Sequence, residues 1–287
     1  MPDTESGAII DKASLSQTVS VFYTNCNDLR NKMGELMMVP ETYGSNLKII
    51  CVTETMFDSD MQTAEINIPN FVPYRKDRLN GKEGGGSCIY VHETIRAREL
   101  ESFNCSDSIA ICVETDPYPF ILVCVYRSQS LTHEENQEII EQITKITIKE
   151  NHELVVVGDW NLPDVSWDIG IVKCPTGTAN KPYILQKNFL DMFNYKKLTW
   201  LLDDSHVTRR RLVDGKLQES LLDQILVSNI DMSRDFKVVP PIGKSYQMEI
   251  LFEIKCNNNK DTVMRVKKNW GKFSKTDFKN IALRIEI

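Results

Sequence analysis

The chain has 287 residues, enough for one large domain or two modest ones with a substantial core. A hydrophobic fraction of 41% and a charged fraction of 26% are typical of a soluble globular protein, and no apolar run reaches the roughly 20 residues of a membrane span. The net charge of −6 argues against a strongly basic nucleic-acid binder, although residues 254–287 carry nine Lys or Arg against three acidic residues.

The cysteines and the N-terminus together predict a reducing, intracellular setting. None of the eight cysteines forms a CxxC pair, and several lie in apolar runs such as 121–126, which disfavours a zinc site and predicts buried thiols. The N-terminus lacks a basic region followed by an apolar stretch, so we expect no secretory signal. Localisation would be nuclear if the protein acts on genomic DNA.

For the first half of the chain, the sequence predicts a tail, five strands and one helix. Residues 1–18 are polar and are expected to form a loose tail. Residues 19–23 alternate apolar and polar side chains, which predicts a strand with Asn25 in its exit loop. Asp28 is placed to cap a helix over residues 29–37. Further strands are expected at 47–52, 87–91, 109–113 and 120–126, the first of them followed by Glu54.

For the second half of the chain, the sequence predicts two helices and three strands. Ile139, Ile143 and Ile146 recur at helical spacing within an expected helix over 134–149. Residues 154–158 are apolar and mostly β-branched, as in an interior strand. A helix over 183–193 and a strand over 221–227 follow, and residues 248–259 resemble an apolar strand and a polar loop. The alternation predicts a layered α/β fold.

Polar side chains lie at the ends of the predicted strands, namely Asn25, Glu54, Tyr126, Asp159 and Asn161. Layered folds collect functional groups there because neighbouring strand ends converge. The two carboxylates suit Mg²⁺, with Mn²⁺ as an alternative, and the amides could contact a phosphate. Each residue also has a structural interpretation as a solvated loop, turn or packing residue, so the pattern alone leaves both interpretations open.

Nine segments in family order resemble the endonuclease domain of non-LTR (LINE-type) retrotransposons, a branch of the endonuclease/exonuclease/phosphatase superfamily. The segments are Tyr23–Lys32, Val52–Thr55, Tyr74–Arg78, Gly84–Val91, Val125–Arg127, Val157–Pro163, Val207–Arg209, Leu222–Leu226 and Pro241–Ser245. The resemblance implies a two-layer β-sandwich flanked by helices, the deoxyribonuclease I-like fold, over residues 19–250.

The resemblance also implies a reaction and roles for named residues. Glu54 would bind the catalytic metal at a centre shared with Asp159, and Asp159 and Asn161 would place the attacking water and the phosphate. Asn25 would also line the metal centre, and Tyr126 would contact the phosphate. Asp223 would be the partner of a catalytic histidine. Thr208 and Arg209 would border the substrate. The reaction would be Mg²⁺-dependent nicking of one DNA strand, leaving the 3′ hydroxyl that primes reverse transcription.

One motif departs from the family pattern. The family closes this domain with Ser-Asp-His, where the His is the general base and the Asp supports the metal site, but here the chain reads Ser245-Tyr246-Gln247. Glutamine takes no proton near neutral pH, and tyrosine, with a pKa near ~10, is a poor base. The departure predicts impaired catalysis. His206, just before Val207-Thr208-Arg209, is an alternative base.

Three functions therefore stand as hypotheses: an impaired DNA endonuclease, a non-catalytic relic that binds DNA or protein, and a phosphatase of the same superfamily. Thr208-Arg209 and Leu162-Pro163 favour the retroelement branch over the phosphatase. Residues 251–287 are basic and resemble the connector that precedes a reverse transcriptase, with a solvated basic helix as the alternative interpretation.

Overall fold

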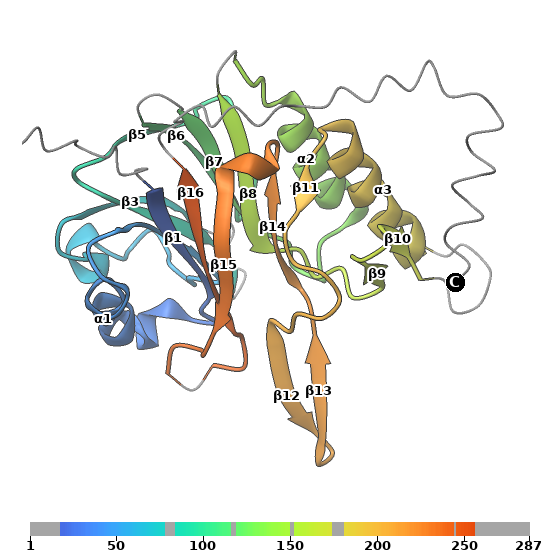
Figure 1. Ribbon diagram of the computed structural model, residues 1–287. Helices are drawn as coiled ribbons and strands as arrows, with labels where there is room; N and C mark the ends of the chain where they lie inside the picture. The colour runs from blue at the N-terminus through green and yellow to red at the C-terminus, as the bar shows by residue number, and fades with distance from the viewer. Residues whose placement is uncertain are drawn as a thin grey trace, which may run out of the picture. The chain divides into compact units, whose positions relative to one another are not determined.

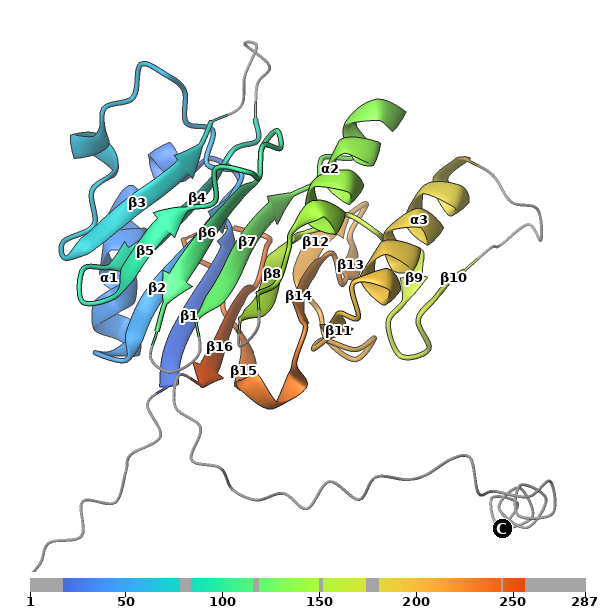
Figure 2. The same ribbon diagram turned by 90° about the horizontal axis from the view of Figure 1, so that it is seen from above.

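The computed structural model describes residues 18–77, 84–115, 119–149, 152–173, 181–243 and 245–255. Over these ranges the chain forms two six-stranded sheets that stack face to face, with the long helices on the outside (Figures 1 and 2). This architecture confirms the predicted two-layer β-sandwich flanked by helices.

The first sheet has its N-terminal strand near the centre. Its order is β15 (Ser233–Val239), β16 (Glu249–Lys255), β1 (Thr18–Asn25), β2 (Leu47–Thr53), β4 (Ser87–His92) and β3 (Phe71–Lys76). Strands β1 and β2 are parallel, so both end at the same edge of the sheet, while the other pairs are antiparallel.

The second sheet repeats this plan. Its order is β11 (Thr199–Trp200), β14 (Asp223–Val227), β8 (Glu153–Asp159), β7 (Phe120–Tyr126), β6 (Ile109–Glu114) and β5 (Arg96–Glu99). Strands β7 and β8 are its parallel pair. Two hairpins, β9–β10 (Val165–Ser166, Ile171–Val172) and β12–β13 (Arg209–Val213, Lys216–Ser220), lie outside both sheets, and Figure 1 shows β12–β13 projecting from the body.

Both faces of the central strands are buried, which explains their nearly continuous apolar sequences. In β8, Val155 and Val157 face the core between the sheets, whereas Leu154 and Val156 face the helices. Helix α1 (Met33–Tyr43) covers the outer face of the first sheet, and α2 (His133–Lys145) and α3 (Lys181–Tyr195) cover that of the second. Three hydrophobic layers result, one between the sheets and one under each helical layer.

Some boundaries differ from the sequence predictions. Helix α2 starts at a capping box on Thr132 and ends at Lys145 rather than at residue 149, because Ile146 leaves helical geometry while still packing in the core. Around Asp28, the expected helix is a short turn, η1 (Leu29–Asn31), followed by α1. Strand β16 ends at Lys255, inside residues 248–259, where an apolar strand followed by a polar loop is expected. The predicted tail and most of the basic connector lie outside the described residues.

The four edge strands, β3, β5, β11 and β15, were not predicted from the sequence. Strands β3, β5 and β15 carry charged residues or proline, as in β3 with Pro73, and β11 has only two residues, so none of the four shows a strong apolar periodicity. Six cysteines within the described ranges are buried and free, and every helix there is too short or too polar to span a membrane.

Candidate active site

The parallel strands β1 and β2 bring Asn25 and Glu54 to one edge of the first sheet. Asn25 ends β1 opposite Thr53, and Glu54 follows directly. Glu54 has a φ of 53°, in the left-handed region that glutamate rarely adopts. Backbone hydrogen bonds from Cys26 to Thr53 and from Asp28 to Glu54 hold this conformation. Residues held in such conformations cluster at functional sites.

One amide group joins the two sheets at this edge. Asn25 Nδ2 donates hydrogen bonds to Glu54 Oε1 and to Asp159 Oδ2, each at 2.8 Å. Its Oδ1 accepts from the backbone of Asn27 at 3.1 Å, which fixes the direction of the amide. The predicted strand-end residues Asn25, Glu54 and Asp159 therefore meet at a single side chain.

Strands β7 and β8 supply the second half of the site. Asp159, opposite Tyr126 in the register, ends β8, and its Oδ1 accepts from the backbone N–H of Asn161 at 3.0 Å. Asn161 also has left-handed backbone geometry, with a φ of 48°. Its Nδ2 donates to Arg127 O at 2.9 Å, and its Oδ1 accepts from Gln129 Nε2 at 3.2 Å. These bonds orient Asn161 from the loop that follows Tyr126.

Asp223 lies behind Asp159 and is fully buried. The two residues are directly opposite across the β8–β14 ladder. Asp223 Oδ1 accepts from Tyr23 Oη at 2.7 Å, while its Oδ2 has no hydrogen-bond partner among the described residues. The residue predicted to orient a histidine is thus held by a tyrosine from β1.

Negative charge is concentrated at this edge. Burial, and then the nearby charges of Asp223 and Glu54, raise the pKa of Asp159 well above its usual range. Burial is also the main reason that the pKa of Asp223 rises to about 7, opposed by its hydrogen bond from Tyr23. The raised pKa values show that negative charge on these two buried groups is costly without a positive partner, and a cation in contact with Asp159 would reduce that cost.

A cavity of about 280 Å³ opens beside these carboxylates. It is lined by Asn27, Glu54, Tyr126, Ser128, Gln129, Asp159, Asn161, Arg209, Ser245, Tyr246 and Gln247. The lining combines two carboxylates with one guanidinium and several amides and hydroxyls, a set that suits a phosphate held next to a cation. Four of the five predicted strand-end residues line this cavity, and the fifth, Asn25, bonds to two of them.

Tyr246 and Gln247, which replace the expected Asp-His pair, line the same cavity. Their segment pairs with the start of β12, since Arg210 N donates to Tyr246 O at 2.8 Å and Gln247 bridges to Arg209. Gln247 is buried and its Oε1 has no partner among the described residues, while Tyr246 is 64% exposed. The substituted side chains therefore face the candidate site.

Comparison with known proteins identifies the family. Residues 24–254 match the model of the endonuclease/exonuclease/phosphatase family. The chain belongs to the endonuclease/exonuclease/phosphatase family. A search of curated proteins found no match.

Solved structures share the fold of this family member. The endonuclease domain of TRAS1, a telomere-specific non-LTR retrotransposon, has a TM-score of 0.63 at 14% identity, covering 84% of this chain and 100% of that one. AP endonuclease LMAP from Leishmania major has a TM-score of 0.65 at 13% identity, covering 84% and 88%. An AP endonuclease from Archaeoglobus fulgidus has a TM-score of 0.58 at 12% identity, covering 82% and 99%.

The donor set of this family member fits a hard divalent cation. No group of three or more His, Cys, Asp or Glu is arranged as a metal cage within the described ranges. Mg²⁺, however, usually binds one or two carboxylates and keeps several waters, and the substrate phosphate supplies further oxygens. Glu54 and Asp159, joined through Asn25, meet that requirement. Asp223, whose Oδ2 has no hydrogen-bond partner among the described residues, is a further carboxyl group directly behind Asp159.

Two of the residues predicted near the site, Thr208 and His206, do not line the cavity. Thr208 is fully buried away from the cavity, and its hydroxyl accepts from the backbone N–H groups of Leu222 and Asp223. It fixes the start of β14, and its hydroxyl also lowers the pKa of the neighbouring Asp223 carboxyl, against the larger effect of burial. His206 bonds to Asp203 at 2.8 Å and does not line the cavity, so its geometry does not support the idea that it replaces the missing base.

Sequence reasoning missed Tyr23, Asn27 and Gln129. Tyr23 looked like an ordinary inward-facing strand residue, and only the second sheet shows its contact with Asp223. Gln129 lies three residues after Tyr126 in a polar loop, and Asn27 lies two residues after Asn25. A search of the loops following each polar strand end would have found both.

Proposed function

We propose that this chain is a Mg²⁺-dependent DNA endonuclease of the retroelement branch, with catalysis impaired by Tyr246 and Gln247. The observation that carries the proposal is the bridging amide of Asn25, which ties Glu54 to Asp159 beside a polar cavity. Nucleases of this superfamily generally use divalent metal ions. Mn²⁺ is the alternative cation, because it prefers the same oxygen ligands.

Each residue of the site has a distinct part in this proposal. Glu54 and Asp159 would hold the cation, which would polarise a phosphoryl oxygen and stabilise charge on the leaving oxygen. Asn25 keeps the two carboxylates in place by donating to both. Asn161 and Tyr126 line the cavity and would contact the phosphate oxygens.

The position of Gln247 accounts for the impairment. A general base has to lie within hydrogen-bond reach of the attacking water. Gln247 occupies the lining where the family resemblance expects histidine, and an amide cannot accept the proton. Asp223, which the resemblance makes the partner of that histidine, is fully buried and does not line the cavity.

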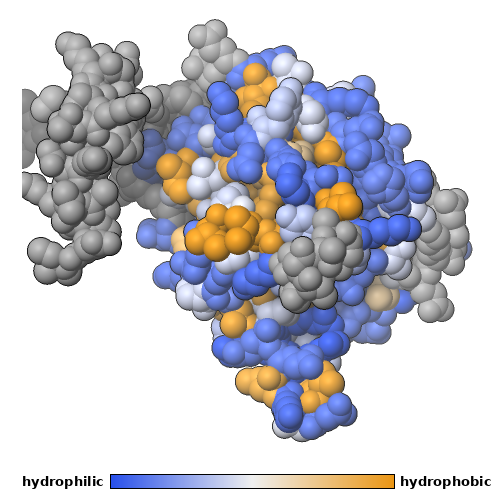
Figure 3. All heavy atoms as spheres, turned by 90° about the vertical axis from the view of Figure 1, so that its right-hand side faces the viewer, coloured by the Kyte–Doolittle hydropathy of each residue, from blue (hydrophilic) through white to orange (hydrophobic). Residues whose placement is uncertain are grey.

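The β12–β13 hairpin supports DNA as the substrate. Arg209, Arg210 and Arg211 are consecutive in β12, next to the candidate site, and the last two are exposed. Toward the tip, Leu212 and Leu217 are opposite one another, with 72% and 60% of their surfaces exposed. Figure 3 shows this hydrophobic tip at the lower end of the molecule. Cations followed by an exposed apolar wedge suit a backbone contact and insertion beside bases.

A non-catalytic DNA-binding relic is the second candidate, favoured by the same Gln247 substitution. Incubation of the purified chain with supercoiled plasmid separates the two functions. The proposal predicts slow nicking with Mg²⁺ that stops in EDTA and in Glu54→Gln, while Glu65→Gln, an exposed residue of the turn η2 (Thr63–Ile66), nicks like wild type.

The other outcomes of this assay discriminate among the alternatives. DNA binding without nicking in Mg²⁺ or Mn²⁺ would reject the endonuclease in favour of the relic. Nicking at the rate of an efficient nuclease would show that Tyr246 and Gln247 do not impair catalysis. Release of phosphate from inositol phosphates, without action on DNA, would instead indicate a phosphatase.

A further inference from the structure

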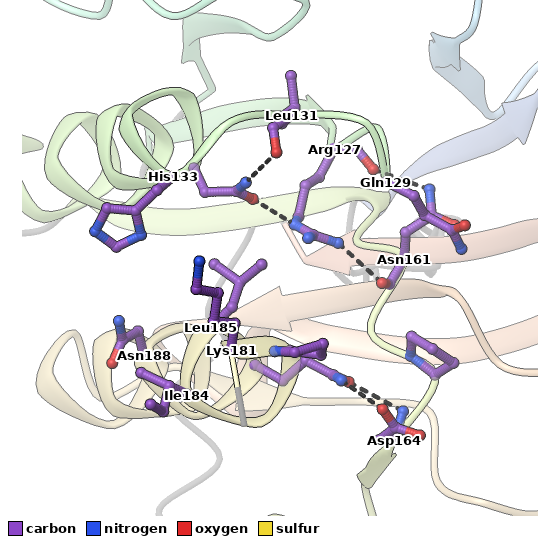
Figure 4. A pocket seen from close by; sticks show the side chains of 14 residues that line it. Arg127, Gln129, Leu131, His133, Asn161, Asp164, Lys181, Ile184, Leu185 and Asn188 are labelled. Atoms are coloured by element: carbon purple, nitrogen blue, oxygen red, sulfur yellow. Dashed lines mark hydrogen bonds between the residues drawn. The ribbon is translucent and has the colours of Figure 1, made fainter. Parts of the chain in front are cut away.

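A second cavity, of about 910 Å³, adjoins the candidate active site. It lies between the N-terminal halves of α2 and α3, and Figure 4 shows side chains from both helices around it. Gln129 and Asn161, which are hydrogen-bonded to each other at 3.2 Å, line both cavities, so the two cavities are neighbours on either side of this pair. A strand whose phosphate lies in the first cavity would therefore have its neighbouring nucleotide at the second.

The charge of the second cavity suits an anionic ligand. Arg127 is only 4% exposed, and its guanidinium bonds to neutral partners alone, namely Asn136 Oδ1 and the carbonyls of Trp160 and Asn161. Burial lowers the pKa of Arg127 to about 10, which leaves it charged at neutral pH. The structure gives it no ion pair within the described ranges.

A second cation stands at the opposite wall. Lys181 begins α3, whose first turn contains no acidic residue, so its charge adds to the positive end of the helix dipole instead of offsetting it. Figure 4 shows Lys181 reaching from α3 toward α2. Among the described residues of the lining, the one carboxylate is that of Asp164, whose Oδ2 already accepts from Gln186 at 2.7 Å. An anion at Lys181 would meet little repulsion.

The remaining walls suit a nucleobase. Leu131 and Leu185 present apolar surface from the two sides, and Asn188 and Gln129 offer amides that can donate and accept at a base edge. The volume lies within the range of roughly 300–1,000 Å³ that is common for small-molecule sites. Cations, apolar walls and a few amides together match a nucleotide better than a purely apolar ligand.

We propose that this cavity binds the nucleotide adjoining the cleaved phosphate of an unpaired DNA strand, with the base between α2 and α3 and a phosphate at Lys181. This inference rests on the proposed function. An unpaired strand is specified because a base enclosed between two helices has lost its pairing partner and its stack. Extracting a base from a duplex costs a few kcal/mol, a cost that a single strand largely avoids.

Fluorescence anisotropy of a short labelled oligodeoxynucleotide, single-stranded or annealed to its complement, tests the proposal in EDTA, where cleavage is blocked. Lys181→Ala should weaken single-strand binding about three- to tenfold and lower the salt slope by about 0.7, as expected for one phosphate contact. Leu185→Trp, which fills the cavity, should weaken it as well. Lys187→Ala is the matched control, because Lys187 is on the same helix but pairs with Asp191 outside the cavity.

Arg210→Ala on the β12–β13 hairpin distinguishes a failure of the cavity proposal from a failure of the endonuclease proposal. If it weakens binding while Lys181→Ala and Leu185→Trp leave binding unchanged, the cavity proposal is wrong and the endonuclease proposal stands. If Lys181→Ala and Leu185→Trp lose as much affinity for duplex DNA as for single-stranded DNA, the preference for an unpaired strand is wrong. No measurable affinity of the wild type for either DNA would overturn both proposals.

Discussion

Replacing Tyr246 by Asp and Gln247 by His in the same chain should turn a slow nuclease into a faster one. Both side chains line the cavity that contains Glu54 and Asp159, so the new groups would face the candidate metal site. The backbone around them is held independently of these side chains, by Arg210 N to Tyr246 O at 2.8 Å and by a bridge at Gln247. The exchange therefore alters chemistry with little change in fold.

The size of the gain follows from the missing base. General acid–base catalysis contributes about 10²–10⁴-fold in rate, and the Gln247 amide supplies none of it. An imidazole with an unperturbed pKa near ~6.5 would be mostly neutral at pH 7.5 and able to accept a proton. We therefore expect a rise of at least about 100-fold, with a rate that increases as pH rises through the histidine pKa and then levels off.

Initial rates of plasmid nicking in Mg²⁺, measured from pH 5.5 to about 8.5, check this prediction. A double variant with alanine at both positions is the control, because it also removes both native side chains but adds no base. If the Asp-His variant folds and still nicks no faster than the alanine control, the missing base is not what limits this chain. A gain without pH dependence would equally refute the reasoning.

Three further predictions concern stability in EDTA. Burial raises the pKa of Glu249 to about 8, so the folded state holds a proton that the unfolded chain releases above about pH 4.5. Denaturant titrations should therefore show the free energy of unfolding fall by a few kcal/mol as the pH rises from about 4.5 toward 8, and Glu249→Gln should not show this fall. Asn25→Asp places a third carboxylate against two others and should lower the melting temperature steeply, with partial recovery in Mg²⁺, by differential scanning fluorimetry. Gly158→Ala should lower stability by about 3 kcal/mol or more in denaturant, because its Cβ would lie 2.0 Å from Val125 O.

Buried strands and strand-end polar residues could be predicted from the sequence because both depend on local patterns. Residues 154–158 are apolar on both faces, and β8 has both faces buried. Asp159 follows directly, so its place at a sheet edge could be inferred without tertiary information. The edge strand β3, with Pro73 and a charged end, carries no comparable pattern.

Contacts between the two sheets could not be predicted in this way. The bond from Tyr23 to Asp223 joins residues that are 200 positions apart, and nothing near either residue signals it. The same holds for Asn25, whose two carboxylate partners come from different sheets. The sequence indicates that Asn25 lies near a strand end, but its hydrogen bonds, like that of Tyr23, depend on how the two sheets stack.

Titration of Mn²⁺ into the metal-free protein by isothermal calorimetry tests most directly whether this edge of the sandwich is a metal centre. We expect one Mn²⁺ site per chain in the wild type, an affinity at least about 100-fold weaker in Glu54→Gln, and wild-type binding in the exposed control Glu65→Gln. Unchanged stoichiometry and affinity in Glu54→Gln would show that any bound metal lies elsewhere, and would contradict the assignment of Glu54, Asn25 and Asp159 as its site.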